Sequence, residues 1–276
     1  MAKLFLGIDL GTSGARALLL DQTGQVVASG KSALSDHSGG PRSPAVWWAA
    51  AQHAVRMALA DVMVQDVVAL AVDGTSGTML AIDAAGAPLS EGLMYNDVCT
   101  DTDLLKRILA VSPETTAARG VTSGLARAVQ LSATGSARVL HQADWIAGKF
   151  SGRWISDENN ALKSGYDPVK GCWPDWIENV IDSAILPDVL APGTVVGEVG
   201  FNEFGLRSDC KVVAGTTDGC ASFLATGATQ AGDGVSALGS TLTIKLLSNH
   251  PIFAPQFGIY SHKILGLWLA GGASNT

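Results

Sequence analysis

Residues 3–21 constrain the fold of this chain more than any other stretch, because two apolar runs there flank a short polar turn. The first run ends at Asp9, the turn occupies residues 11–14 with the sequence GTSG, and the second run ends at Asp21. This pattern predicts two strands joined by a tight loop. Such a loop offers N–H groups and hydroxyls to phosphate oxygens and a carboxylate to hydrated Mg²⁺. Because the stretch matches neither a P-loop nor a Rossmann turn, a phosphate-binding loop and a plain hairpin turn both remain open.

Composition excludes several classes of protein. The 276 residues are 47% hydrophobic and 16% charged, which is typical of a well-buried globular chain. The net charge of -7 includes no basic cluster, so nucleic acid is not an expected partner. The four cysteines form no CxxC pair, which disfavours a disulfide framework and a zinc site. The first strand begins almost at once and no apolar run is long enough to cross a bilayer, so we expect a cytoplasmic protein without a membrane partner.

Strand and helix patterns alternate along the rest of the chain. A helix is expected to begin at Pro44 and to place Trp47 in the core. A polar stretch at residues 151–167 predicts a binding loop or a solvated loop, and residues 112–132 predict a loop or weak helix. Further strands are predicted at 25–30, 66–73, 79–83, 211–214, 235–238, 242–247, 258–261 and 267–270, and helices at 101–109, 136–150, 173–181 and 220–226.

Turns rich in glycine and hydroxyl residues recur twice after the first loop. One spans residues 73–78 with the sequence DGTSGT, and the other spans residues 239–241 with the sequence GST. The pattern predicts three hairpins of one kind, two of them able to hold the ends of a triphosphate. Asp218 stands where a strand gives way to a helix, so its carboxylate is a candidate general base in the field of the helix N-terminus. The alternative is that Asp218 only caps the helix.

Together these stretches resemble the FGGY carbohydrate kinases of the actin-like ATPase superfamily. IDLGTS at residues 8–13 is similar to the first phosphate motif of that family, GTTD at residues 215–218 to the segment with the catalytic base, and ALGST at residues 237–241 to the second phosphate motif. YND at residues 95–97 is similar to the sugar-contacting Trp-Asn-Asp element. Residues 73–78, 160–163 and 258–262 resemble more closely the cyanobacterial and plant-plastid sugar kinases that are related to xylulokinase and prefer D-ribulose. Cys99 stands where the family has an arginine, so sugar specificity does not transfer directly.

The resemblance implies a fold and a set of site residues. The implied fold is α/β: a ribonuclease H-like domain with a mixed sheet flanked by helices at residues 1–228, and the beginning of a second domain of the same type, which binds nucleotide, at residues 229–276. The implied catalytic residues are Asp218 and Asp9, and Asp9 is also expected to hold Mg²⁺ through water. The residues implied for ATP phosphates are Gly11, Thr12, Ser13, Arg16, Gly239, Ser240 and Thr241. Those expected to contact the sugar are Thr75, Ser76, Asn96, Asp97, Asp157 and Asp218.

The implied activity is ATP-dependent phosphorylation of a ketopentose, D-ribulose first and D-xylulose next, with ATP and Mg²⁺ as cofactors. The expected partner is a ketopentose or related polyol, and a homodimer is an open alternative to a monomer. Arg16 either reaches a phosphate or is an edge-strand arginine facing solvent. Two other functions stay open: an actin- or chaperone-type ATPase that needs no sugar, and a sugar-binding fragment without catalysis. The family's kinases continue for a long second domain, of which only the first strands are expected here.

Overall fold

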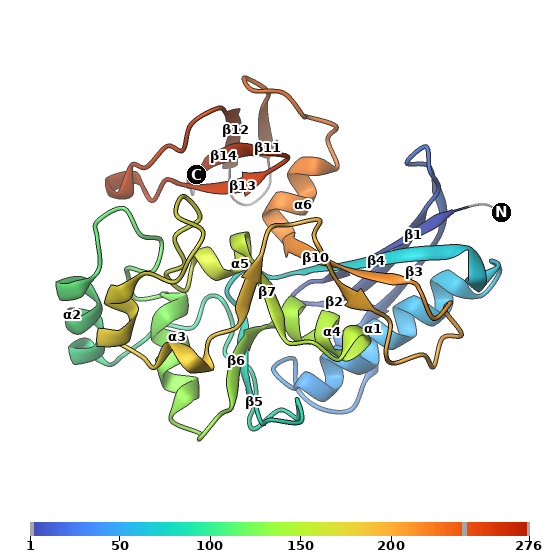
Figure 1. Cartoon of the computed structure of the whole chain (residues 1–276), viewed down its shortest axis with the longest axis horizontal. Coiled ribbons are helices and arrows are strands. Elements are labelled where there is room, and N and C mark those ends of the chain that lie inside the picture. Colours follow the sequence, from blue (N-terminus) through green and yellow to red (C-terminus); the bar gives the residue numbers. More distant parts are fainter. Residues whose placement is uncertain (1–2, 239–241, 275–276) are drawn as a thin grey trace.

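A six-stranded mixed sheet organises most of the chain (Figure 1). The structure is a computed structural model that describes residues 3–238 and 242–274. The first three strands form an antiparallel meander, and β4 and β10 continue the sheet parallel to β1. In spatial order the strands are β3 (Val26–Ala33), β2 (Gly14–Leu20), β1 (Leu4–Leu10), β4 (Val67–Gly74), β10 (Lys211–Thr217) and β9 (Val195–Glu198). The meander and the parallel strand at residues 66–73 confirm the predictions for these stretches.

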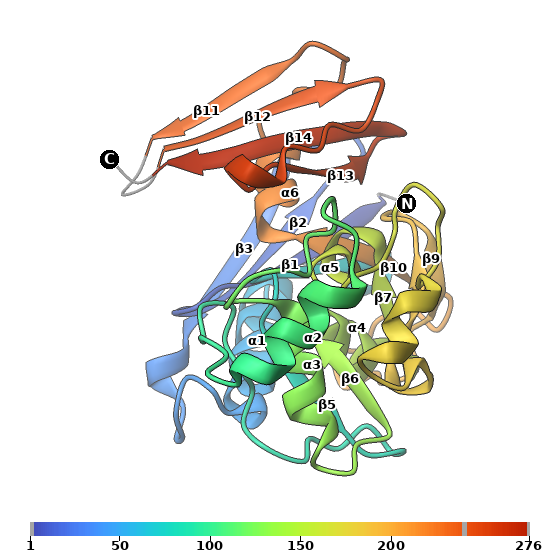
Figure 2. The same cartoon turned by 90° about the vertical axis from the view of Figure 1, so that its left-hand side faces the viewer.

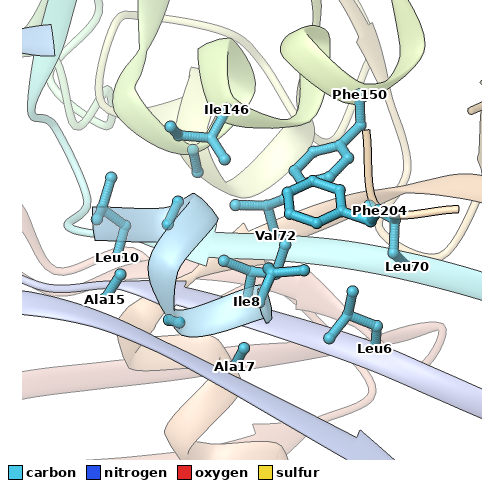
Figure 3. Packing of buried hydrophobic residues seen from close by; sticks show 14 of the residues in the cluster. Leu6, Ile8, Leu10, Ala15, Ala17, Leu70, Val72, Ile146, Phe150 and Phe204 are labelled. Carbon is cyan, nitrogen blue, oxygen red and sulfur yellow. The ribbon is translucent and has the colours of Figure 1, made fainter. Parts of the chain in front are cut away.

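Helices α1 (Pro44–Leu59) and α4 (Gln142–Ser151) pack on one face of this sheet, and α6 (Asp218–Leu224) lies on the other (Figure 1). Alternating side chains of the central strands point toward α1 and α4, which is the pleat of a strand with one buried face. Trp47 on α1 is fully buried, as predicted. Figure 3 shows the core between the sheet and α4, where the labelled side chains are Leu6, Ile8, Leu10, Ala15, Ala17, Leu70, Val72, Ile146, Phe150 and Phe204.

A second, smaller core lies beside the sheet, around the pair β5 (Met79–Ile82) and β6 (Arg138–His141). Helices α2 (Thr102–Val111) and α3 (Gly124–Ser132) cover it. The predicted helix at 136–150 is therefore wrong in its first turn, because residues 138–141 pair with β5. The four residues are too few to show a strand period, and the helix that follows them hides the change. Residues 112–132 contain a regular helix whose N-cap is Ser123.

The centre of the polar stretch at residues 151–167 is buried regular structure and not a loop, whereas turns remain at its two ends. It forms strand β7 (Ile155–Asp157), which pairs with β8 (Asp188–Leu190), and helix α5 (Glu158–Leu162). All five residues of α5 are buried. Hydrogen bonds from the polar side chains to buried backbone and to one another make this burial tolerable. The single-turn 3₁₀ helix Asp175–Asn179 replaces the longer helix predicted at 173–181.

An antiparallel sheet of four strands forms the second layer of structure, above α6 and α5 (Figure 2). Its order is β11 (Gly234–Leu238), β12 (Leu242–Ser248), β14 (Leu267–Ser274) and β13 (Tyr260–Ile264). Buried side chains of the sheet meet α6, mainly Leu247, Ile264 and Leu269 against Phe223. The turn predicted at Gly239, Ser240 and Thr241 lies outside the described residues.

The second glycine-hydroxyl turn does not make a hairpin. β4 belongs to the six-stranded sheet and β5 to the two-stranded one, so residues 75–78 carry the chain from one sheet to another. The predicted set of three similar hairpins is wrong on this point. No helix among residues 3–238 and 242–274 is long and apolar enough to cross a membrane.

Candidate active site

Four polar side chains form a row across the sheet, on the face opposite α1 and α4. Arg16 of β2 pairs in register with Asp9 of β1, Asp9 with Asp73 of β4, and Asp73 with Thr216 of β10. Residues in register on neighbouring strands point to the same face, so the row follows from the pairing itself. The Arg16 Nη1 donates to the Asp9 Oδ2 at 3.2 Å. Arg16 is not on an edge strand, because β2 lies between β3 and β1.

Asp73 is the charged residue of this row that the sequence analysis did not propose for the site. Its Oδ1 is buried and has no hydrogen-bond partner among the described residues. Burial, followed by the neighbouring charges of Asp9 and Asp218, raises the pKa of Asp73 to about 8. Its position at the carboxyl end of a buried parallel strand, next to the strand of Asp9, was the available signal. The site thus contains three carboxylates, with Arg16 paired to only one of them.

Asp218 is the first residue of α6, and its side chain is exposed. The helix is capped by Thr217, whose side chain accepts a hydrogen bond from the Cys220 N–H. The alternative that Asp218 serves as the helix cap is therefore wrong. The Asp218 Oδ1 accepts one hydrogen bond, from the Gly219 N–H at 2.7 Å. An exposed carboxylate with free lone pairs can accept a proton from a ligand hydroxyl.

A hollow of about 360 Å³ separates the row from α6. Asp9, Asp73, Thr216 and Ala221 line it. Among residues 3–238 and 242–274, no three His, Cys, Asp or Glu side chains are placed to hold a metal ion by themselves. The residues still fit Mg²⁺, which prefers one or two carboxylates with water and phosphate oxygens, because the unpartnered Asp73 oxygen is free to accept a cation or a water bound to it.

The first glycine turn leaves two of its predicted phosphate contacts exposed. The Gly11 N–H donates to the Gly14 oxygen at 2.9 Å, which closes the hairpin and leaves that N–H unavailable to a phosphate. Thr12 and Ser13 face solvent. A hollow of about 400 Å³ next to the turn is lined by Ser13, Arg16, Lys31 and Asp36, among others. The phosphate roles of this turn stay predictions, and Gly239, Ser240 and Thr241 lie outside the described part of the chain.

Thr75 and Ser76 follow β4 directly and are placed differently. The Thr75 hydroxyl donates to the Leu10 oxygen at 3.4 Å and is buried against the first strand. The Ser76 Oγ is buried without a partner in the described chain. Ser76 therefore has an unused polar atom, whereas Thr75 contributes to holding the loop in place.

Asn96 and Asp97 lie on a loop beside this region. Asn96 is exposed, and Asp97 accepts two hydrogen bonds from the Arg42 guanidinium, at 2.5 and 2.6 Å. The hydrogen bonds from Arg42, together with the N–H of Met94, hold the pKa of Asp97 below its usual range. The buried Arg127 donates to the Asp97 backbone oxygen at 3.3 Å. Arg42 and Arg127 were not proposed from the sequence, since neither lies in a recognisable motif.

Asp157 is 2% exposed and serves as the N-cap of α5. Its carboxylate accepts hydrogen bonds from the backbone N–H groups of Asn159 and Asn160 and from the Asn160 side chain. Burial and the charge of Asp144 raise the pKa of Asp157 to about 7 despite these bonds. The sugar contact of Asp157 stays a prediction, and the position of this residue favours a structural role.

A pocket of about 280 Å³ lies between the loop after β4, the start of α6 and the four-stranded sheet. It brings together Ser76 and Asp218, which were both predicted to meet the sugar. Lys163 also lines the pocket, and Lys245 and His262 enter it from the four-stranded sheet. Asn96, Asp97 and Asp157 are not among the described residues that line it.

Comparisons with known proteins agree with this architecture. Residues 4–110 match the N-terminal domain of the FGGY family of carbohydrate kinases. The chain is 26% identical over 270 residues to a xylulose kinase of Streptomyces rubiginosus, covering 87% of this chain and 53% of that protein. It is 33% identical over 95 residues to a xylulose kinase of an Arthrobacter species, covering 34% of this chain and 94% of that sequence.

The solved structures show the same fold. A crystal structure of xylulose kinase from Rhodospirillum rubrum superposes with a TM-score of 0.86 at 23% identity, covering 99% of this chain and 61% of that one. The chain thus spans about half the length of the Streptomyces relative that it matches. Its mixed sheet flanked by helices is the actin-like ATPase fold expected from the sequence. On its 33% identity to the Arthrobacter protein, 94% of which it covers, and in agreement with the match of residues 4–110, the chain belongs to the FGGY family of carbohydrate kinases.

Proposed function

We propose that this chain carries the sugar-binding and catalytic half of an ATP-dependent pentulose kinase. The observation that carries the proposal is that Ser76 and Asp218 line one pocket, with Asp9 and Asp73 in a row beside it. A polyol needs several hydroxyl-binding groups, and phosphoryl transfer needs a base next to a place for phosphates and Mg²⁺. The pocket and the row supply these two needs side by side.

In the proposed reaction Asp218 accepts the proton of a terminal sugar hydroxyl while that oxygen attacks the γ-phosphorus of ATP. Asp218 must be ionised to do this, and its exposed carboxylate at the start of α6 is accessible to the sugar hydroxyl. Asp9, with Asp73 beside it, would hold Mg²⁺ through water, and the ion would neutralise charge that develops on the phosphates. Thr12, Ser13 and Arg16 are the described candidates for phosphate contact.

The relatives indicate which pentulose is the preferred substrate. The relatives from Streptomyces and Arthrobacter are both xylulose kinases, so we place D-xylulose ahead of D-ribulose. The order expected from the sequence alone was the reverse, and these names do not support it. We keep Asn96 and Asp97 as candidates at the rim of the sugar site, because their loop adjoins Thr78 through the Tyr95 N–H.

We further propose the domain division expected from the sequence, with residues 1–228 as the sugar-binding unit and residues 229–276 as the beginning of the nucleotide-binding unit. The six-stranded sheet and the four-stranded sheet share no strand, and α6 ends before the second sheet begins at Gly234, which supports the division. A cytoplasmic location and a homodimer stay predictions.

The test is ADP formation by the chain with Mg²⁺ and ATP, alone and with D-xylulose, D-ribulose or glycerol. We expect ADP only with a pentulose, and more with D-xylulose than with D-ribulose. ADP formed without any sugar would replace the proposal with a plain ATPase. Binding of pentulose in calorimetry without ADP formation would reduce the proposal to sugar binding.

A further inference from the structure

Two residues that line the pocket at Asp218 each carry a buried polar atom that no described group satisfies. The Ser76 Oγ belongs to the loop after β4, and the His262 Nε2 belongs to β13 of the four-stranded sheet. Both atoms are buried, although His262 as a whole residue is only half-buried. A buried polar atom without a partner destabilises the folded chain, because it has lost its hydrogen bonds to water. A ligand with hydroxyl groups in the pocket would supply partners to both atoms at once.

The far wall of the pocket is held in place by a buried amide. Asn159 of α5 accepts from the Lys263 N–H at 2.8 Å and donates to the Lys263 oxygen at 3.0 Å. The same amide donates to the Thr216 hydroxyl of β10 at 3.0 Å. Asn159 is fully buried, and the Lys263 ammonium also lies 3.3 Å from the Glu158 carboxylate. His262 precedes Lys263, so these contacts fix its backbone relative to Thr216 of β10 and hence to Asp218, which follows that strand.

The surroundings of His262 keep its imidazole neutral. Burial, together with the positive charges of Lys163 and Lys245, lowers the pKa of His262 to about 3. Asp218 is the negative group that lines the same pocket, and the ring of Tyr260 lies 5.4 Å from the imidazole ring. A neutral imidazole carries one donor and one acceptor nitrogen, and a hydroxyl can serve as the partner of either.

We propose that His262 is a sugar-contacting residue, whose Nε2 binds a hydroxyl of the ketopentose from the side opposite Ser76. The inference rests on the proposed function, since it takes the pocket at Asp218 to be the sugar site. It adds a contact from the four-stranded sheet, so that the sugar is held between the two units of the chain. Lys245 assists indirectly, because its ammonium donates to the Gly219 oxygen and keeps α6 against the sheet.

The test is calorimetric titration of the chain with D-xylulose, without ATP, in three forms: wild type, His262→Leu and His262→Gln. Leucine keeps the bulk of the ring without polar atoms, whereas the glutamine amide can reach the position of Nε2. We expect the Kd for D-xylulose to rise about two- to tenfold in His262→Leu, and His262→Gln to recover most of the loss. His250→Leu, an exposed histidine of the same sheet region, is the matched control and should bind as the wild type does.

A measurement on the wild type covers the case in which His262→Leu does not fold. The imidazole nitrogens of His262, assigned by the loss of their resonances in His262→Gln, should shift in ¹⁵N NMR when D-xylulose is added. Equal Kd values for wild type and a folded His262→Leu, or unshifted nitrogens at saturating sugar, would overturn the role of His262 and leave the kinase proposal standing. A wild type that binds no pentulose would overturn both. Binding without ADP formation overturns catalysis alone.

Discussion

Asp73 and Asp97 are both carboxylates next to predicted kinase motifs, yet their surroundings shift their pKa values in opposite directions. Asp97 accepts two hydrogen bonds from the Arg42 guanidinium, and its pKa is lowered. Asp73 lies near two other acids, Asp9 and Asp218, with one oxygen unpartnered, and its pKa is raised to about 8. The folded chain itself compensates the negative charge of Asp97, through Arg42. The charge of Asp73 is compensated only when the carboxylate binds a proton or a cation, which is typical of a functional site.

The largest expected effect concerns Asp218, the exposed member of the acidic group. We expect Asp218→Ala to lower sugar-dependent ADP formation by about 10²–10⁴-fold, because the attacking hydroxyl loses its base. The melting temperature should stay unchanged, since the side chain is exposed and Thr217 caps α6. The measurement is steady-state ADP release with D-xylulose, with Asp61→Asn, an exposed surface acid, as the control. Wild-type turnover in Asp218→Ala would remove Asp218 from its role.

The next effect separates Asp73 from an ordinary acid through the pH dependence of stability. Because the folded pKa of about 8 lies above the unfolded value of about 4, ionisation of Asp73 destabilises the folded chain. Wild-type stability should therefore fall as pH rises from about 4 to about 8. We expect Asp73→Asn to lose this fall and to melt several degrees higher than wild type at pH 8, in thermal scans without divalent ions.

The same Asp61→Asn substitution serves as the control for Asp73, since it also removes one carboxylate. If the difference in melting temperature between Asp73→Asn and wild type is the same at pH 5 and at pH 8, the pKa of Asp73 is not raised in the folded chain. The comparison with Asp97 would then lose its basis.

The smallest effect is expected on the other side of the comparison. Arg42→Met keeps the aliphatic stem and removes the partner of Asp97, which should lower the free energy of unfolding by about 1 kcal/mol at pH 7, because the pair is partly exposed. The folded pKa of Asp97 is lowered, so the stabilisation by Arg42 is present above the unfolded pKa and is lost as pH falls through the folded one. Urea unfolding at pH 7 and at pH 3 measures this change.

Arg207→Met is the control for Arg42, because it removes an exposed pair between close neighbours in sequence, with Asp209. We expect a smaller loss of stability than in Arg42→Met. A difference between Arg42→Met and wild type that stays constant down to pH 3 would show that packing of the guanidinium, and not its charge, is what Asp97 requires.

The sequence predicted best what depends on local pattern. The meander from β1 to β3, the helix that begins at Pro44 and the acid at the start of α6 all follow from periodicity and turn residues. The predictions from the sequence were wrong where contacts between distant segments determine the structure. Residues 138–141 form a strand because β5 pairs with them, and Asn159 of α5 is buried because its hydrogen-bond partners come from distant segments.

The candidate site also contains both kinds of residue: those found from local motifs and those that only tertiary contacts bring together. Asp9 and Asp218 lie in motifs and were found from the sequence, whereas Asp73 matters through its register with Asp9 across parallel strands. His262 and Lys245 reach the pocket only because the four-stranded sheet packs on α6, which no spacing along the chain reveals. Asp157 fitted the family pattern, but its carboxylate is occupied by the N-terminus of α5.

The amide of Asn159 has a consequence for the order in which the protein is built. Its backbone partner Lys263 lies 104 residues later in the chain. At a synthesis rate of about 5–20 residues per second, that strand leaves the ribosome on the order of 5–20 s after Asn159. β9 and β10 complete the six-stranded sheet and are both synthesised before Lys263, so this sheet can fold while the Asn159 amide still lacks its backbone partner. The wall that carries His262 is therefore the last part of the pocket to form, and the nascent chain has its acidic row before it can enclose a sugar.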